Sequence, residues 1–486
     1  MKSIYEQIDD CVRLNGCLPS DFALRDAAKT SDPIQSHLGE LEGLVGSRIA
    51  ASVDEKALET CISIIKENLE IAPKLAVHNF DDYDFGFPVA SIRGHLLKKI
   101  IDNMYDFDPH KLSTLAYSLV MFGEKTETVK LGLLLLVLFD FANDEVAKKH
   151  IVTMGMYEDF TSYVISNTKS FADEYRNHIY YVYGRKLSGW GKINAVAVLE
   201  PINDEVREWL LCEGCRNDVS YALTAKLVAD KVNLIEVLKK GMLTDAQMNG
   251  VRDIVYGLLE GENGGRISEY SNPAQFIALY LGELVKHEIK LEDIANLYRM
   301  ESYLEKYDKK SEKSLADRVI VQIERILAGF SVEDKISRSL MTNPEVAIRA
   351  AKEGRIDISD ELLTLLQKDY ENYCQYGDFF LANDINVKDF LEVSSEHIIK
   401  GASPDLVLNY IDRYPGEGVE ILRFCLETES AFYRSSVADV VLTWEKNSNA
   451  NVKKISSDLF KDIKKLKKKE TDDNLKLKWD EIIAYK

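Results

Sequence analysis

Two cysteines three positions apart, Cys212 and Cys215, form a recognisable chemical motif in this chain. A C-x-x-C pair can act as a redox couple or supply half of a tetrahedral zinc site. Zinc needs two further ligands, and no second C-x-x-C or neighbouring His supplies them. A redox pair is expected beside a βαβ pattern, which is missing here. We therefore interpret Cys212 as a core residue and Cys215 as the residue that follows a helix-ending glycine.

A second group of metal-ligating residue types lies in one acidic stretch: His78, Asp81, Asp82, Asp84 and His95. Their oxygen and imidazole donors would suit a divalent cation. Their spacing matches neither an EF-hand loop nor the H-E-x-x-H helix. We interpret the stretch as an acidic surface loop and predict no metal site.

Nucleotide and redox-cofactor patterns are also missing. The glycine-rich stretch 261–266 lacks the Gly-Lys-Ser/Thr ending of a phosphate-binding loop and the preceding strand. No dinucleotide or haem pattern is present, whereas the ligands of a non-haem iron triad could lie far apart in sequence. The sequence therefore predicts no catalytic residue and no cofactor.

Aromatic and polar side chains offer a different kind of chemistry, that of partner recognition. Three tyrosines cluster at positions 180–183, a tryptophan follows at 190, and Tyr370, Tyr373 and Tyr376 form a stripe at helical spacing. Aromatic residues dominate interface energetics, but a helical stripe is also typical of a core. Polar residues just after an expected helix end are candidates as well. The predicted partner-binding residues are Tyr180, Tyr183, Trp190, Arg216 and Asn217.

Composition limits the class of protein that positions these residues. The 486 residues are 46% hydrophobic and 29% charged, which excludes disorder. The net charge of −19 argues against binding to nucleic acid or an anionic membrane. Seven cysteines, an odd number and mostly far apart, indicate free thiols in a reducing compartment. The N-terminus has no secretory pattern, and the longest apolar run, Leu133–Phe139, is far shorter than the ~20 residues of a membrane span. We expect a cytoplasmic protein.

Helical periodicity dominates the chain. Between Val53 and Ile71, apolar residues recur at three- and four-residue steps, and Ser52 with Glu55 fits a capping box before them. Thr244 with Gln247 repeats that capping pattern. Strand-like alternation between tight-turn dipeptides is missing. The predicted class is therefore all-α.

An internal repeat indicates how the helices are arranged. Asn143-Asp144-Glu145-Val146 recurs as 203–206, and weaker copies begin at 343 and 403. Asn or Ser caps a helix start, acidic residues favour the first turn, and a following glycine is expected to end the helix in the left-handed conformation. We expect Gly155 and Gly214 to do so. Helix hairpins of this kind cannot bury both apolar faces alone, so a stacked solenoid is predicted.

The stretch from about residue 106 to 230 resembles HEAT repeats, with an apolar helix, a short turn containing Asp-Glu-Val and a second helix. A longer string is more specific: Gly189-Trp190-Gly191-Lys192-Ile193, followed by 199–201 and 209–217. It resembles a group of bacterial HEAT-like proteins, some of which carry the name limonene hydroxylase. The resemblance implies an α-α superhelix of the HEAT/ARM kind. The name would imply an oxidoreductase, whose apparatus is not visible in this sequence.

These patterns divide the chain into an irregular helical region at 1–105, a HEAT-like stack at 106–305 and further helical repeats at 306–486. The last segment ends in a lysine-rich amphipathic helix that we expect to cap the stack. The predicted function is a non-enzymatic scaffold that binds a protein or peptide on its concave face. Two alternatives are an enzyme of the hydroxylase label and, against the net charge, a HEAT-like nucleic-acid-binding protein.

Overall fold

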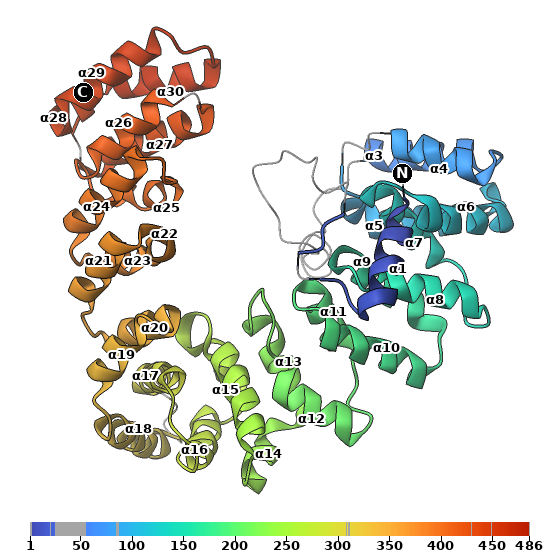
Figure 1. Cartoon of the computed structure of the whole chain (residues 1–486), viewed down its shortest axis with the longest axis horizontal. Helices are drawn as coiled ribbons and strands as arrows, with labels where there is room; N and C mark the ends of the chain where they lie inside the picture. Colours follow the sequence, from blue (N-terminus) through green and yellow to red (C-terminus); the bar gives the residue numbers. More distant parts are fainter. Residues whose placement is uncertain are drawn as a thin grey trace. The chain divides into compact units, whose positions relative to one another are not determined.

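The computed structural model describes residues 2–19, 21–24, 55–83, 87–307, 309, 312–428, 430–448 and 450–485, with backbone only at 262–265 and 382–383. Within these ranges every regular element is a helix, which confirms the predicted all-α class. The chain separates into two compact units, Met1–Glu288 (unit 1) and Ile289–Lys486 (unit 2). The division into three segments stays a prediction from the sequence. Figure 1 follows the helices in chain order.

Unit 1 consists of short helices in its described residues. Its α-helices are α1 (Ile4–Asn15), α3 (Glu55–Asn68), α4 (Pro73–Asp82), α5 (Val89–Asp102), α6 (Pro109–Phe122), α7 (Thr126–Leu136), α8 (Glu145–Met154), α9 (Glu158–Asn167), α10 (Asp173–Lys186), α11 (Trp190–Val198), α12 (Asp204–Glu213), α13 (Ala222–Val232), α14 (Leu234–Lys240), α15 (Asp245–Leu259) and α16 (Pro273–Leu284). Short 3₁₀ helices occupy 104–106, 168–170 and 262–269. Ser52, the expected cap of α3, lies outside the described residues.

Helices of unit 1 that follow one another in the chain pack in pairs. α6 packs on α7, α8 on α9, α10 on α11 and α12 on α13. The second members form a continuous row, because α5, α7, α9, α11, α13 and α15 each contact the next. α10, α12 and α14 pack against this row but not closely against one another.

Carboxylates of unit 1 hold successive pairs together. Asp81 in α4 accepts hydrogen bonds from the backbone N–H groups of Glu124 and Lys125 at 3.0 and 3.1 Å. Glu283 in α16 accepts one from Leu243 at 2.8 Å. In each case a side chain of one helix satisfies the N–H groups of a turn 40 to 44 residues away. These bonds stabilise the turns, because the N–H groups would otherwise lose their hydrogen bonds to water on folding without gaining a new acceptor.

The two clearest copies of the repeat start their helices in different ways. Asn203 caps α12 by accepting from the Val206 N–H at 2.9 Å, as predicted. In the other copy the cap of α8 is Asp144, which accepts from Val146 and Ala147, and not Asn143. The Thr244–Gln247 capping box of α15 is confirmed.

The predicted left-handed ends at Gly155 and Gly214 are wrong. Their φ values are −67° and −65°, an ordinary right-handed backbone. A Cβ on Gly155 would lie 2.2 Å from the Tyr183 hydroxyl oxygen, and one on Gly214 would lie 2.6 Å from the Leu210 carbonyl oxygen. Close approach of neighbouring atoms, and not a positive φ, therefore explains both glycines.

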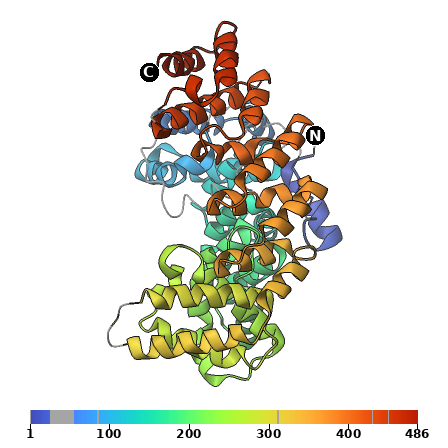
Figure 2. The ribbon, with the colours of Figure 1, turned by 90° about the vertical axis from the view of Figure 1, so that its left-hand side faces the viewer.

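Unit 2 is again entirely helical in its described residues. Its α-helices are α17 (Leu291–Glu305), α18 (Lys313–Ala328), α19 (Val332–Ser339), α20 (Pro344–Gly354), α21 (Ser359–Lys368), α22 (Tyr370–Tyr373), α23 (Asp378–Asn383), α24 (Val387–Ile399), α25 (Asp405–Leu408), α26 (Val419–Glu427), α27 (Ala431–Ser448), α28 (Val452–Ile455), α29 (Ser457–Lys467) and α30 (Asp473–Ala484). Short 3₁₀ helices follow at 374–376 and 411–413. α17 and α18 lie side by side in yellow in Figure 2.

Two rows of helices run through the later part of unit 2. α21, α24, α26 and α29 contact one another in sequence, and α25, α27 and α30 form the second row. Aromatic donors connect successive layers. The Tyr373 hydroxyl donates to the Leu340 carbonyl at 3.3 Å, the Tyr414 hydroxyl to Leu381 at 2.5 Å, and the Trp444 indole N–H to Ile411 at 2.9 Å. All three bonds span 33 residues.

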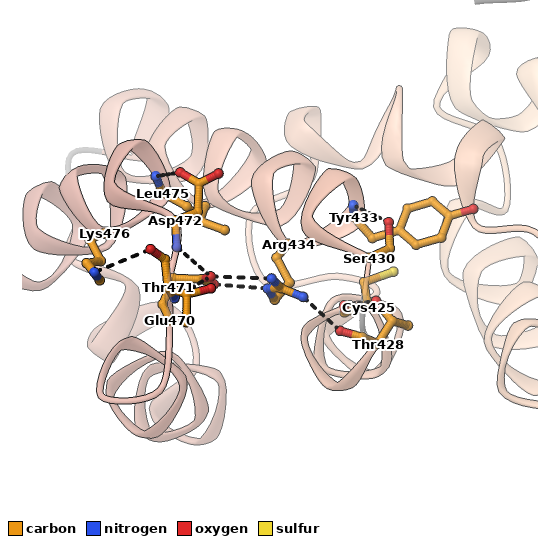
Figure 3. A network of polar contacts seen from close by, with 10 residues as sticks. All are labelled: Cys425, Thr428, Ser430, Tyr433, Arg434, Glu470, Thr471, Asp472, Leu475 and Lys476. Atoms are coloured by element: carbon orange, nitrogen blue, oxygen red, sulfur yellow. Dashed lines mark hydrogen bonds and ion pairs between the residues drawn. The ribbon is translucent and has the colours of Figure 1, made fainter. Parts of the chain in front are cut away.

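A buried ion pair joins the last helices of unit 2 (Figure 3). The Arg434 guanidinium on α27 contacts both carboxylate oxygens of Glu470 at 3.0 and 3.3 Å and donates to the Thr428 carbonyl at 3.1 Å. Glu470 also accepts from the N–H groups of Thr471 and Asp472 just before α30. Burial alone would raise the pKa of Glu470, but the bonds from Arg434, Asp472 and Thr471 outweigh it and lower that pKa.

Candidate interaction grooves beside α12

The Gly-Trp-Gly string at the start of α11 encloses a carboxylate. Glu158, at the start of α9, accepts hydrogen bonds from the N–H groups of Ser188 and Gly189 at 3.1 and 3.0 Å, and from Gly191. A Cβ on Gly191 would lie 2.6 Å from the Glu158 Oε2, so only glycine fits there. Burial raises the pKa of Glu158, although these N–H groups oppose the shift. The string therefore has a structural explanation: it binds an internal anion at a helix start.

Three of the five predicted binding residues are aromatic and buried. The Tyr180 hydroxyl lies 2.8 Å from the Thr168 hydroxyl, and the Tyr183 hydroxyl donates to the Val152 carbonyl at 2.7 Å. Trp190 is 8% exposed and its indole N–H has no partner. These side chains hold α10 and α11 to the preceding helices, and their contact with a partner stays a prediction.

The other two, Arg216 and Asn217, form the turn between α12 and α13. Asn217 is buried, donates to the Cys215 and Ser220 carbonyls at 3.0 Å, and accepts from two N–H groups of the same turn. Arg216 is 48% exposed and pairs with Asp253 of α15 at 2.7 Å. Among the five predicted residues, Arg216 alone presents its side chain to solvent.

An aromatic and cationic row lies beside the predicted residues, on the opposite face of α10. The Tyr181 ring meets the Trp209 ring edge-on at 5.5 Å. The Arg185 guanidinium lies 5.4 Å from the Tyr181 ring, and the Lys192 ammonium lies 5.6 Å from the Trp209 ring. Trp209 rests directly on Gly184, where a Cβ would approach the indole to 2.6 Å. Cations on aromatic faces stabilise this row.

A groove of about 420 Å³ opens between α10 and the start of α12. Its lining from α10 includes His178, Tyr181 and Arg185, and α12 with its preceding turn contributes Ile202 and Glu205. The Tyr181 hydroxyl donates to Glu205 at 3.1 Å across the groove. Ile202 is 55% exposed, so an apolar side chain faces solvent within a charged rim. We call this the α10–α12 groove.

A second groove, of about 340 Å³, lies on the other flank of α12. It is bounded by α12 and by the turn between α14 and α15, with Leu211 and Val237 in its lining. Met242 at its edge is 88% exposed and has a φ of 59°, an uncommon backbone conformation for this residue type. We call this the α12–α14 groove. The two grooves make α12 a ridge with an apolar side chain exposed on either side.

The chemical motifs considered in the sequence have structural explanations. Cys215, and not Cys212, is the buried residue of the pair, and burial raises the pKa of the Cys212 thiol to about 11 and that of Cys215 to about 12, so both stay protonated near neutral pH. The expected acidic surface loop is wrong for most of its residues, because His78, Asp81 and Asp82 lie in α4 and His95 lies in α5. Asp81 is buried and caps a turn, His78 lies 3.3 Å from Asp82, and Asp84 is outside the described residues. Within the described ranges no three His, Cys, Asp or Glu residues come together as a metal site would require.

Comparison of the chain with protein-family models, curated proteins and solved structures found no match. Among the helices of the described ranges, none combines the length and the apolar character needed to cross a bilayer. The grooves beside α12 are therefore assessed on their own geometry.

The sequence singled out Tyr180 and Tyr183, which are buried, whereas the half-buried Tyr181 and Trp209 form the row beside the groove. Of the tyrosines at 180–183, Tyr181 is the one that lines the α10–α12 groove. In the sequence, Trp209 appears only as part of the longer string. It lies 17 residues from Lys192, and no local pattern indicates that the two side chains are neighbours. The grooves themselves depend on the separation of α10, α12 and α14, which no local pattern encodes.

Proposed function

We propose that the chain is a scaffold of stacked helix pairs and that unit 1 binds an extended segment of a protein partner across α12. The stacking is supported by the rows of helices and by the bonds that repeatedly connect one pair to the next. Repeat stacks of this kind bind through extended surfaces, because each pair contacts only its neighbours.

The observation that carries the proposal is the pair of grooves that flank one helix, each with an exposed apolar side chain. Exposed apolar groups inside a polar rim are typical of interaction sites. A helix with its side chains is about 10–12 Å wide, and an extended chain advances about 3.3 Å per residue. A partner that crosses α12 would therefore place two apolar side chains about three or four residues apart, one near Ile202 and one near Met242.

The grooves also bear on which face the partner occupies. α10, α12 and α14 are more widely separated than the row from α5 to α15. In a curved stack the more widely spaced row lies outside, so we place the partner on the convex side, in contrast to the concave face expected from the sequence.

The rim charges are mixed and favour a protein over nucleic acid. Arg185 and Lys186 face Glu174 and Glu205 in the α10–α12 groove, and Arg207 and Lys240 accompany Asp204 and Glu208 in the other. A phosphate backbone would require an excess of cations. No observation favours the oxidoreductase alternative.

The test uses Ile202→Glu with Met242→Glu. A carboxylate at each position would place an unpaired charge against an apolar anchor of the partner. Proteins captured from the native host by the wild-type chain would be identified by mass spectrometry, purified and titrated against both proteins. We expect the double variant to bind at least about tenfold more weakly, equivalent to about 1.4 kcal/mol.

Met341→Glu with Leu477→Glu is the matched control, because both side chains are exposed apolar residues of unit 2, at 76% and 68%. The control should bind like wild type. Equal binding by wild type and the Ile202/Met242 variant would refute the proposed site.

A further inference from the structure

A cluster of lysines marks the end of unit 2, in a chain whose net charge is −19. The apolar stripe of α29 is buried: Leu459 and Ile463 are 0% exposed, and α29 packs on α26 and α30. The lysines occupy the remaining faces of α29 and the turns beside it. Those that are exposed and have no carboxylate of a described residue within 4 Å are Lys453, Lys454, Lys464, Lys465, Lys468 and Lys469. We call these residues the lysine patch.

Other lysines of the same segment are neutralised within the fold. Lys461 pairs with Asp458 at 2.8 Å, and Lys467 pairs with Asp480. The other acid of α29, Asp462, is paired with Arg423 at 2.8 Å. The fold therefore leaves the lysine patch without an internal counter-charge.

The patch gathers like charges at the end of α29. Lys464 and Lys465 lie in the last turn of α29, where the negative end of the helix dipole favours cations. Lys468 and Lys469 follow directly after the helix, so the neighbouring ammonium groups repel one another. Lys453 and Lys454, which precede α29, gain nothing from that dipole. A set of mutually repelling cations is best explained by an external anion.

The surroundings of the patch decide among anionic partners. Its apolar stripe is already buried, so α29 has no free apolar face to insert into a membrane. The patch contains no arginine, the neighbouring Arg423 is paired with Asp462 and Glu420, and Phe460 is only 8% exposed, so the patch offers little planar surface to read or stack on bases. α29 has 11 residues and is about 16 Å long. A long polyanion would extend past it onto a chain that is acidic overall.

We propose that the lysine patch binds a short acidic segment of a protein partner, rich in Asp or Glu. Lysine suits such a segment, because a mobile ammonium pairs with carboxylates without demanding a fixed geometry. An extended peptide of about five residues matches the length of α29. This site lies in unit 2 and does not depend on the grooves beside α12.

The test measures fluorescence anisotropy of a labelled oligoglutamate peptide titrated with the full chain at low salt. Lys465→Glu, Lys468→Glu and Lys469→Glu combined should weaken binding at least about tenfold, and added NaCl should weaken wild-type binding. The control is Lys98→Glu, Lys99→Glu and Lys400→Glu, which changes the net charge equally at exposed lysines elsewhere. It should bind within about twofold of wild type.

Three further outcomes would overturn the proposal. Tighter binding of a single-stranded oligonucleotide, or of phosphatidylserine vesicles, would assign the patch to nucleic acid or membrane. Absence of oligoglutamate binding at low salt would make it a solvated surface. A neutral variant, Lys465→Gln, Lys468→Gln and Lys469→Gln, separates folding from binding: we expect an equal or higher melting temperature with weaker binding. A lower melting temperature would mean that these lysines serve the fold.

Discussion

Each unit uses a glutamate to satisfy backbone N–H groups at a turn, but the two carboxylates have opposite electrostatic surroundings. In unit 1, Glu158 is partly buried and receives bonds from backbone donors, with no Lys or Arg within 4 Å among the described residues. In unit 2, Glu470 is 2% exposed at its side chain and is paired with Arg434. The pKa of Glu158 is raised by burial, whereas that of Glu470 is lowered. At Glu158 the backbone donors do not offset desolvation, whereas at Glu470 the guanidinium and two backbone N–H groups together outweigh it.

The largest expected effect follows from removing the cation. Arg434→Met would leave Glu470 as a buried charge without its partner, and we expect a loss of about 3–5 kcal/mol in the free energy of unfolding. Urea denaturation followed by circular dichroism measures this loss. Arg423→Met is the control, because its pair with Asp462 is about one-third exposed. The control should lose less than about 1 kcal/mol. Equal losses would mean that burial does not make the Arg434–Glu470 pair more important for stability than the Arg423–Asp462 pair.

Replacing each glutamate with Gln tests the opposite pKa shifts. Each variant should lose about 1–3 kcal/mol near neutral pH, because an amide offers a single acceptor oxygen to several N–H groups. Glu158 has a folded pKa above its ordinary 4.5, so its contribution to stability is complete below that value and falls as pH rises through the folded pKa. Glu470 has a folded pKa below 4.5, so its contribution is present above that value and is lost as pH falls further.

The measurement is the unfolding free energy of wild type and both variants across the acidic range. The difference between wild type and Glu158→Gln should grow as pH falls from neutral towards 4.5. The difference between wild type and Glu470→Gln should shrink as pH falls below 4.5. If both stability differences grow, or both shrink, as pH falls, the opposite pKa shifts of Glu158 and Glu470 are contradicted.

The smallest effect is expected at an aromatic bond of unit 2. Tyr373→Phe removes the 3.3 Å bond to the Leu340 carbonyl and keeps the ring, so we expect a loss of about 0.5–1.5 kcal/mol. Tyr376→Phe is the control, because Tyr376 is partly exposed in the same stripe and makes no such bond across layers. Thermal unfolding would compare them. A loss at Tyr376 as large as that at Tyr373 would show that these bonds do not connect the layers.

The sequence predicted helices well because helix starts are local. The Thr244–Gln247 box and the Asn203 cap need only residues within one turn, and the structure confirms both. The glycines were harder, since Gly155 is explained by the Tyr183 hydroxyl 28 residues away in sequence. The roles of Glu158 and Glu470 had no signal at all, because their partners include backbone N–H groups, which every residue but proline carries.

The candidate site shows a limit of a different kind. Tyr180, Tyr181 and Tyr183 look alike in composition, and a tyrosine suits either a core or a surface. One residue along α10 turns a side chain by about 100°, so the buried and exposed tyrosines differ only in phase. To choose between Tyr181 and the pair Tyr180 and Tyr183, one must know which side of α10 packs against the row of helices from α5 to α15.

The constant 33-residue span of the aromatic bonds in unit 2 has a consequence for synthesis on the ribosome. Leu340–Tyr373, Leu381–Tyr414 and Ile411–Trp444 each join residues that emerge within a short interval of one another. None of the three bonds requires a residue from a distant part of the chain, and contacts that are local in sequence form quickly. Each layer of this region can therefore close on the one before it while the next is still being translated.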